Sequence, residues 1–221
     1  MAGASEPSDA VQSDGPSSSR EVELKFDVDG DTPLPDWTDL PGVASISAPE
    51  PRALDARYFD TDDLALARAG YALRRRTGGP DAGWHIKGPR DGDARTELHW
   101  PLGEDATIPA GVHEAVRAAV PSAAAASLLP LARIRNDRTA YHLRGAGGGV
   151  LAEFVDDHVV ATDERTGIER AWREWEMELG AAAPREQDEI AAFFTAVEAA
   201  VSAAGARPAA SDSKLARTLG R

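Results

Sequence analysis

The feature that most constrains this chain is a strict alternation of charged and apolar side chains within short segments. In the segment 20–26, REVELKF, the charged residues Glu21, Glu23 and Lys25 alternate with apolar ones. Successive side chains of a β-strand point to opposite faces, so a strand of this kind has one ionic face and one apolar face. The fold therefore depends on which of the two faces lies inside.

The same alternation recurs along the chain and predicts antiparallel β-structure. We expect strands over 21–28, 56–60, 71–77, 84–88, 94–100, 133–144, 150–160 and 171–179. Turn residues such as Gly78-Gly79-Pro80 separate these segments, and most connections are too short for parallel crossovers. Helices are expected over 64–68, 111–119 and 185–204, the last with an apolar stripe and a glycine just beyond its end.

Length and composition limit the domain organisation. A chain of 221 residues fits one sizeable domain. Residues 1–19 consist mainly of Ser, Pro, Asp, Gly and Ala, and we expect them to form a disordered tail. The folded domain is expected to span residues 20–221.

The charge and the missing residue types exclude several classes of function. A net charge of −13 argues against a general affinity for nucleic acid or an anionic membrane surface. The absence of cysteine excludes disulfides and thiolate chemistry. No apolar run is long enough to span a bilayer, and the first residues lack the order of a signal peptide. We therefore expect a cytoplasmic soluble protein that binds neither nucleic acid nor a membrane, and a homodimer is left open.

The ionic faces have an unusual composition. They contain few Ser, Thr, Asn or Gln residues, and they group like charges, with three Glu in 174–178 and two Arg in 74–76. An ordinary sheet with a solvated face of cross-strand ion pairs is one interpretation. The other is a barrel whose charged face lines a wet bore, with the apolar face turned outward under helices. Arginine and lysine would bind phosphate there, and carboxylates would bind divalent cations.

The motifs resemble those of a known family. The segment 21–25, EVELK, is similar to the ExExK signature of the CYTH superfamily, also called triphosphate tunnel metalloenzymes. Further landmarks follow in order: Tyr58-Phe59-Asp60-Thr61, the segments 70–76 (GYALRRR), 84–87 (WHIK) and 95–97 (RTE), the arginine-rich segment 133–138, Glu153 with Asp157, the segment 174–179 (EWEMEL) and Ser213-Lys214. The resemblance covers residues 20 to about 217.

This resemblance implies an α+β fold, an eight-stranded antiparallel β-barrel forming a tunnel, with helices packed on its outer face. It also implies a triphosphate bound together with Mg²⁺ or Mn²⁺. The implied metal ligands, direct or through water, are Glu21, Glu23, Glu153, Asp157, Glu174, Glu176 and Glu178. The implied phosphate-binding residues are Lys25, Arg74, Arg76, Lys87, Arg95, Arg133, Arg135, Arg138 and Lys214, of which Lys25, Arg74, Arg76 and Lys87 are the catalytic candidates.

Strand parity decides which face we expect two ambiguous positions to occupy. Asp156 and Asp157 are adjacent acids, and Asp157 is favoured as the tunnel residue because it shares its parity with Glu153. Arg75 has the parity of the outer face.

The implied activity is metal-dependent hydrolysis of a triphosphate, with inorganic tripolyphosphate as the first substrate to test. Two alternatives use the same tunnel differently. One is an organic triphosphate as substrate, in a class IV-like adenylyl cyclase or a thiamine triphosphatase. The other is a non-catalytic module that binds polyphosphate or a nucleotide.

Overall fold

Eight long antiparallel strands form the body of the protein. The computed structural model describes residues 15–221 apart from positions 93, 124–125 and 212. The long strands are β1 (Ser17–Val28), β3 (Glu50–Asp60), β4 (Ala72–Thr77), β5 (Gly83–Asp91), β6 (Ala94–Pro101), β7 (Leu129–Arg144), β8 (Val150–Asp163) and β9 (Glu169–Leu179). Two short strands, β2 (Ser45–Ile46) and β10 (Arg207–Pro208), pair with β7 and β1. Each predicted strand is present, and β3 begins six residues earlier than expected.

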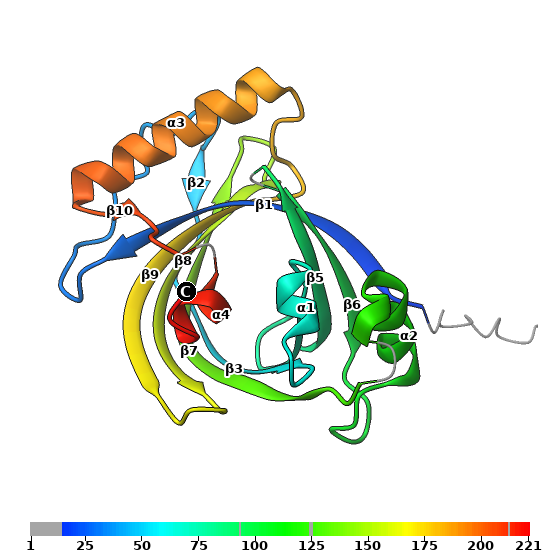
Figure 1. Ribbon diagram of the computed structural model, residues 1–221. Helices are drawn as coiled ribbons and strands as arrows, with labels where there is room; N and C mark the ends of the chain where they lie inside the picture. The colour runs from blue at the N-terminus through cyan, green and yellow to red at the C-terminus, as the bar shows by residue number, and fades with distance from the viewer. Residues whose placement is uncertain (1–14, 93, 124–125, 212) are drawn as a thin grey trace, which may run out of the picture.

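The sheet closes into a barrel because β1 has two partners. The strand order is β1-β6-β5-β4-β3-β7-β8-β9, and β9 pairs again with β1 (Figure 1). The first half of β1, 17–22, pairs with β6, and the second half, 23–28, pairs with β9. Residues 17–19, which we expected in the tail, therefore belong to this ladder, while residues 1–14 lie outside the described part of the chain. The predicted barrel is confirmed.

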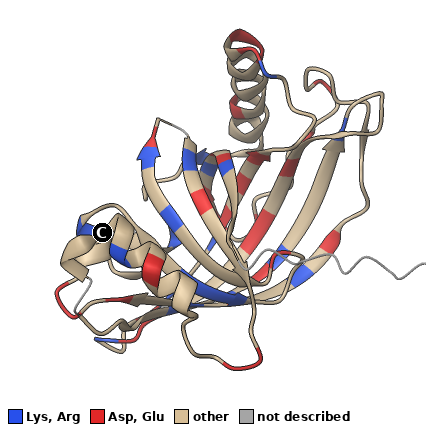
Figure 2. Cartoon of the chain, turned by 90° about the vertical axis from the view of Figure 1, so that its right-hand side faces the viewer, with Lys and Arg blue, Asp and Glu red and all other residues tan. Residues whose placement is uncertain are grey.

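The barrel is inverted, as the parity argument requires. Phe26, Trp175 and Met177 are buried in an apolar cluster on the outer face, and Val22 and Leu24 pack against it. The charged residues that alternate with them line the interior of the barrel. Figure 2 shows the resulting basic and acidic bands along the barrel strands.

Helices supply the cover that the outward apolar faces need. Helix α3 (Gln187–Ala204) packs Phe193, Phe194, Val197 and Val201 onto the cluster formed by β1, β8 and β9. Helix α2 (Ala110–Ala119) covers a second cluster around Trp84 and Trp100 on β5 and β6. Both helices lie where the sequence predicts them. Among the described residues, no helix is long and apolar enough to cross a bilayer.

The short helix α1 (Ala65–Arg68) is fixed by a buried carboxylate. Asp60 is 1% exposed and accepts hydrogen bonds from the backbone N–H groups of Thr61, Leu66 and Ala67 at 2.7, 2.9 and 3.0 Å. The N–H groups of Leu66 and Ala67 are donors that a helix start leaves without partners. These contacts give Asp60 a structural role at this turn.

The C-terminal helix α4 (Lys214–Thr218), which the sequence patterns did not predict, lies at one end of the barrel (Figures 1 and 2). Its Leu215 packs with Ala56, Tyr58 and Ile134, which line the bore. Ser213 accepts a hydrogen bond from the N–H of Ala216 at 3.1 Å and caps the helix. The C-terminus thereby covers one end of the bore and places Lys214 inside it.

Candidate functional site

The ionic faces of the strands enclose a bore with two connected compartments. An inner compartment of about 70 Å³ lies next to α4, and a mouth compartment of about 170 Å³ lies on the side away from α4. The two share the lining residues Glu23, Arg74, Arg76, Lys87 and Arg138. The two compartments therefore adjoin one another along the bore.

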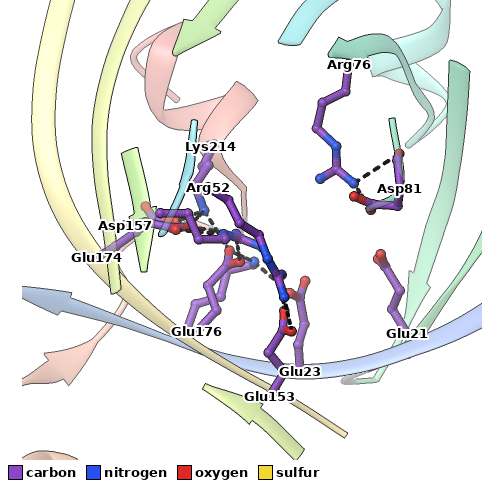
Figure 3. Close-up of polar contacts among 12 residues, drawn as sticks. Glu21, Glu23, Arg52, Arg76, Asp81, Glu153, Asp157, Glu174, Glu176 and Lys214 are labelled. Carbon is purple, nitrogen blue, oxygen red and sulfur yellow. Dashed lines mark hydrogen bonds and ion pairs between the residues drawn. The ribbon is translucent and has the colours of Figure 1, made fainter. Parts of the chain in front are cut away.

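Three buried carboxylates meet in the inner part of the bore. Asp157, Glu174 and Glu176 each offer an oxygen atom, and these atoms lie within 4.8 Å of one another. The Nζ atom of Lys214 lies among them, 2.8 Å from Asp157, 2.5 Å from Glu174 and 2.8 Å from Glu176 (Figure 3). We call these three carboxylates the acidic cluster. It binds a cation, which in this structure is an ammonium group of the protein itself.

Strand register brings these like charges together. Asp157 is directly opposite Glu174 across β8 and β9, and Glu178 is opposite both Glu153 and Glu23. Carboxylates in opposing positions repel one another unless a cation lies between them. The strand register therefore requires positive charge between the carboxylates along this wall of the bore.

Two cations in addition to Lys214 form ion pairs with these carboxylates. Arg138 donates to Asp157 at 2.8 and 2.7 Å and to Glu176 at 2.9 Å. Lys25 donates to Glu23 at 2.8 Å and forms an ion pair with Glu176. Burial raises the pKa of Glu176, but the charges of Lys214, Lys25 and Arg138 outweigh it and hold that pKa well below the ordinary value. Glu176 is thus ionised and shared by three cations.

The opposite wall carries a second group of acids and bases. Lys87 donates to both oxygens of Glu21, at 2.8 and 2.7 Å, and lies 3.4 Å from Glu97. His85 Nδ1 lies 2.5 Å from Glu97. Burial, followed by a hydrogen bond with Glu97, raises the pKa of Glu21 to about 7. Burial would also raise the pKa of Glu97, but the hydrogen bond from His85 and the charge of Lys87 hold it well below its usual value.

Two arginines at the mouth are paired with acids. Arg76 forms an ion pair with Asp81 from the loop between β4 and β5 (Figure 3). Arg52 donates to both oxygens of Glu153 at 3.0 Å, and its Nε donates to Glu50 at 2.9 Å. Glu153 is therefore held by a bidentate arginine pair, as Asp157 is by Arg138.

The structure corrects two of the predicted phosphate-binding residues. Arg133 and Arg135 point to the outer face, with side chains 48% and 55% exposed, and they pair with Asp55 and Glu169. The inward positions of β7 are 134, 136 and 138. Because Arg138 faces the bore, residues at odd positions of the same strand face outward. The placement of Arg133 and Arg135 in the tunnel is wrong.

All other predicted site residues face the bore. The basic ones are Lys25, Arg74, Arg76, Lys87, Arg95, Arg138 and Lys214, and the acidic ones are Glu21, Glu23, Glu153, Asp157, Glu174, Glu176 and Glu178. Asp156 faces the outer cluster, where it pairs with Arg173 at 2.8 Å and accepts from Trp175 Nε1 at 3.0 Å. Asp157 is thus the tunnel acid of the two. What each residue does there stays a prediction.

Sequence reasoning missed three charged residues that the structure places among the site residues. Glu97 is not among the predicted site residues, although it shares the inward parity of Arg95. Arg52 has the same parity as Tyr58, so a longer β3 would have revealed it. Asp81 belongs to a turn, and no strand pattern indicates where its side chain points.

Comparisons with known proteins place these features in a family. The sequence profile of the CYTH domain matches residues 19–201. The chain belongs to the CYTH domain family. Two uncharacterized proteins of Mycobacterium tuberculosis, MT2285 and Rv2226, are each 39% identical to this CYTH domain over 225 residues and cover 95% of it. The chain spans 42% of the length of these relatives.

Solved structures share the fold. The PH1819 protein of Pyrococcus horikoshii has a TM-score of 0.57 and 16% identity, with 90% of this chain and 98% of that chain covered. A candidate adenylate cyclase of Bacillus halodurans also has a TM-score of 0.57, with 18% identity and 90% and 97% coverage. HpAC1 of Hippeastrum, a candidate adenylyl cyclase described as having a dominant triphosphatase activity, has a TM-score of 0.50, 16% identity and 90% and 95% coverage.

The donor set of the acidic cluster fits a divalent cation. Mg²⁺ and Mn²⁺ prefer oxygen ligands, and the cluster offers three carboxylates in close proximity. The carboxylates already stabilise positive charge. Although burial lowers the pKa of Lys214, the acids Asp157, Glu176 and Glu174 raise it well above its ordinary value.

Proposed function

We propose that this CYTH domain hydrolyses a triphosphate in a reaction that depends on Mg²⁺ or Mn²⁺, with inorganic tripolyphosphate as the preferred substrate. The observation that carries the proposal is the interleaving of both signs of charge in one bore. Glu176 alone contacts Lys25, Arg138 and Lys214. A site for an anion needs only cations, and a site for a metal needs only acids. A metal–triphosphate complex uses both.

The cations of the bore would bind the phosphate chain and stabilise the charge that develops in hydrolysis. A water oxygen would form a bond to phosphorus and lose a proton, a phosphoanhydride bond would break, and the leaving phosphate would take the electron pair of that bond, with the proton passing to the leaving phosphate or to solvent. The candidates for contact with the reacting phosphate are Lys25, Arg74, Arg76 and Lys87. The candidates for contact with the other phosphate groups of the triphosphate are Arg95, Arg138 and Lys214. Opposite charges about 4 Å apart interact by roughly 4 kcal/mol at an effective dielectric near 20. Several fixed contacts of this kind would favour the transition state.

The acids would hold the metal. The candidates are Glu21, Glu23, Glu153, Asp157, Glu174, Glu176 and Glu178. Glu153 has both oxygens on Arg52, and Asp157 has both oxygens on Arg138. When bound, the ion would neutralise negative charge on the phosphate oxygens and lower the pKa of water. Lys214 competes with it for the oxygens of the acidic cluster.

One cavity favours an organic triphosphate as the second candidate. A cavity of about 340 Å³ between α1, α4 and strands β5 and β6 adjoins the inner compartment through Arg95 and Ser213. Tyr71, Leu215 and Leu219 contribute to its lining. It offers room for an organic group attached to the triphosphate. The names of the Bacillus and Hippeastrum neighbours keep an adenylyl cyclase among the alternatives, together with thiamine triphosphate hydrolysis.

A substrate panel tests the proposal. Purified protein is incubated with tripolyphosphate, ATP or thiamine triphosphate, each with Mg²⁺, with Mn²⁺ and with EDTA, and all products are quantified. We expect the highest kcat/KM for phosphate release from tripolyphosphate, and no release with EDTA. Cyclic AMP from ATP would instead indicate the cyclase. Saturable, metal-independent binding without product would indicate a binding module and contradict hydrolysis.

A further inference from the structure

The loop between β4 and β5, residues 78–82, brings a carboxylate from the surface to a buried cation of the bore. Asp81 forms an ion pair with Arg76, and Arg76 Nη2 also lies 3.4 Å from the carbonyl oxygen of Asp81 (Figure 3). The side chain of Arg76 is 8% exposed, whereas that of Asp81 is 56% exposed. The guanidinium group of Arg76 faces the bore, and the Asp81 carboxylate contacts it from the solvent side.

This loop is held in place from two sides. Gly78 has a φ of +77°, and a Cβ atom there would lie 2.0 Å from the carbonyl oxygen of Ala53 on β3, so only glycine allows the close approach. On the other side, His85 Nε2 lies 3.0 Å from the carbonyl oxygen of Asp81, and His99 Nε2 lies 3.4 Å from that of Ala82. The position of the Asp81 carboxylate is thus fixed by the fold around it.

Arg76 is in an environment that favours a bound anion. Burial, together with the charges of Arg74 and Arg138, lowers the pKa of Arg76 to about 9. The planar fork of a guanidinium binds carboxylate and phosphate oxygens in the same way. The Asp81 carboxylate consequently uses donors that a phosphate group in the mouth compartment would use.

We propose that Asp81 is an internal competitor for phosphate at Arg76 and thereby sets the affinity of the mouth compartment for its substrate. The inference rests on the proposed function, because that proposal assigns a phosphate contact to Arg76. A tethered carboxylate competes at high effective concentration. Because Asp81 is half exposed, its ion pair is weak enough for a triphosphate with several contacts to displace it. Asp81 is therefore a residue that lowers the affinity for phosphate and that substrate binding must displace.

The variant Asp81→Asn tests the proposal by comparing its effect on substrate binding with its effect on turnover. The amide keeps the size of the side chain and removes its charge. We expect KM for tripolyphosphate with Mg²⁺, and Kd by calorimetry without metal, to fall about two- to fivefold, and kcat to change by a smaller factor than either. The control Asp39→Asn removes the same charge from an exposed loop and should change neither value. A KM and Kd that rise or stay constant in Asp81→Asn overturn the proposal.

The outcomes separate this inference from the proposed hydrolysis. Tighter binding by Asp81→Asn without phosphate release supports the role of Asp81 and refutes hydrolysis. Phosphate release with unchanged KM and Kd supports hydrolysis and refutes the role of Asp81. If neither protein binds tripolyphosphate, both are refuted.

Discussion

Replacing Glu21 and Glu23 together by glutamine should reduce metal-dependent phosphate release from tripolyphosphate on the order of a thousandfold. The amides keep the shape of the side chains but remove two candidate metal ligands. They also remove the counter-charge of Lys87, which donates to Glu21 at 2.8 and 2.7 Å, and of Lys25, which donates to Glu23 at 2.8 Å. The measurement is the initial rate of phosphate release at saturating Mn²⁺.

The double variant should stay folded. Lys25 keeps its ion pair with Glu176, and Lys87 keeps Glu97 at 3.4 Å, so neither ammonium is left without an acid. We expect a loss of about 1–2 kcal/mol in the free energy of unfolding. The matched control Glu189→Gln with Glu198→Gln removes the same charge from exposed positions of α3 and should leave the rate unchanged. Wild-type activity in the Glu21/Glu23 variant would remove the proposed metal site.

Replacing Trp175 by alanine should strongly reduce stability and leave activity nearly unchanged, the opposite of the Glu21/Glu23 variant. The side chain is 0% exposed and lies under α3 on the outer face, with its ring 5.7 Å from that of Phe154 in an edge-on arrangement. Its loss leaves a large cavity, and we expect the free energy of unfolding to fall by about 3–5 kcal/mol. The activity per folded molecule should change little, because the neighbouring Glu176 points into the bore and Trp175 does not. Chemical denaturation and the phosphate assay measure the two quantities.

The control for Trp175→Ala is Ile168→Ala. Ile168 is 49% exposed, and its replacement should change stability by no more than about 0.5 kcal/mol. A small loss of stability together with a large loss of activity in Trp175→Ala would place Trp175 at the bore and contradict the inverted barrel.

Strand parity predicted most of the fold and of the inner wall. It depends only on the period of two along a strand, so a common face for Glu21, Glu23 and Lys25 could be inferred without knowing how the strands pair. The inward position of that face was inferred from its charge composition and from the family resemblance. The same rule selected Asp157 over Asp156. It failed at Arg133 and Arg135 because their place in an arginine-rich motif was given more weight than their parity. Arg138 faces the bore, so the parity of β7 would have excluded them.

The residues that sequence could not place depend on contacts between distant segments. Lys214 was selected only by family resemblance, because α4 has five residues and is too short for a helical pattern. Its ammonium reaches Asp157, Glu174 and Glu176 only because the C-terminus folds back over the barrel. Asp81 reaches Arg76 through the conformation of a turn. Such positions follow from tertiary packing and have no periodic signal.

The most direct test of the account is the coupling between metal and triphosphate. Calorimetry measures the affinity for tripolyphosphate with EDTA and with Mg²⁺, corrected for the complex that the two form in solution. Because acids and bases alternate in the bore, we predict that Mg²⁺ tightens tripolyphosphate binding at least about tenfold, and that tripolyphosphate tightens Mg²⁺ binding by the same factor. Equal affinity for tripolyphosphate with and without Mg²⁺ would contradict a bore built to bind both together.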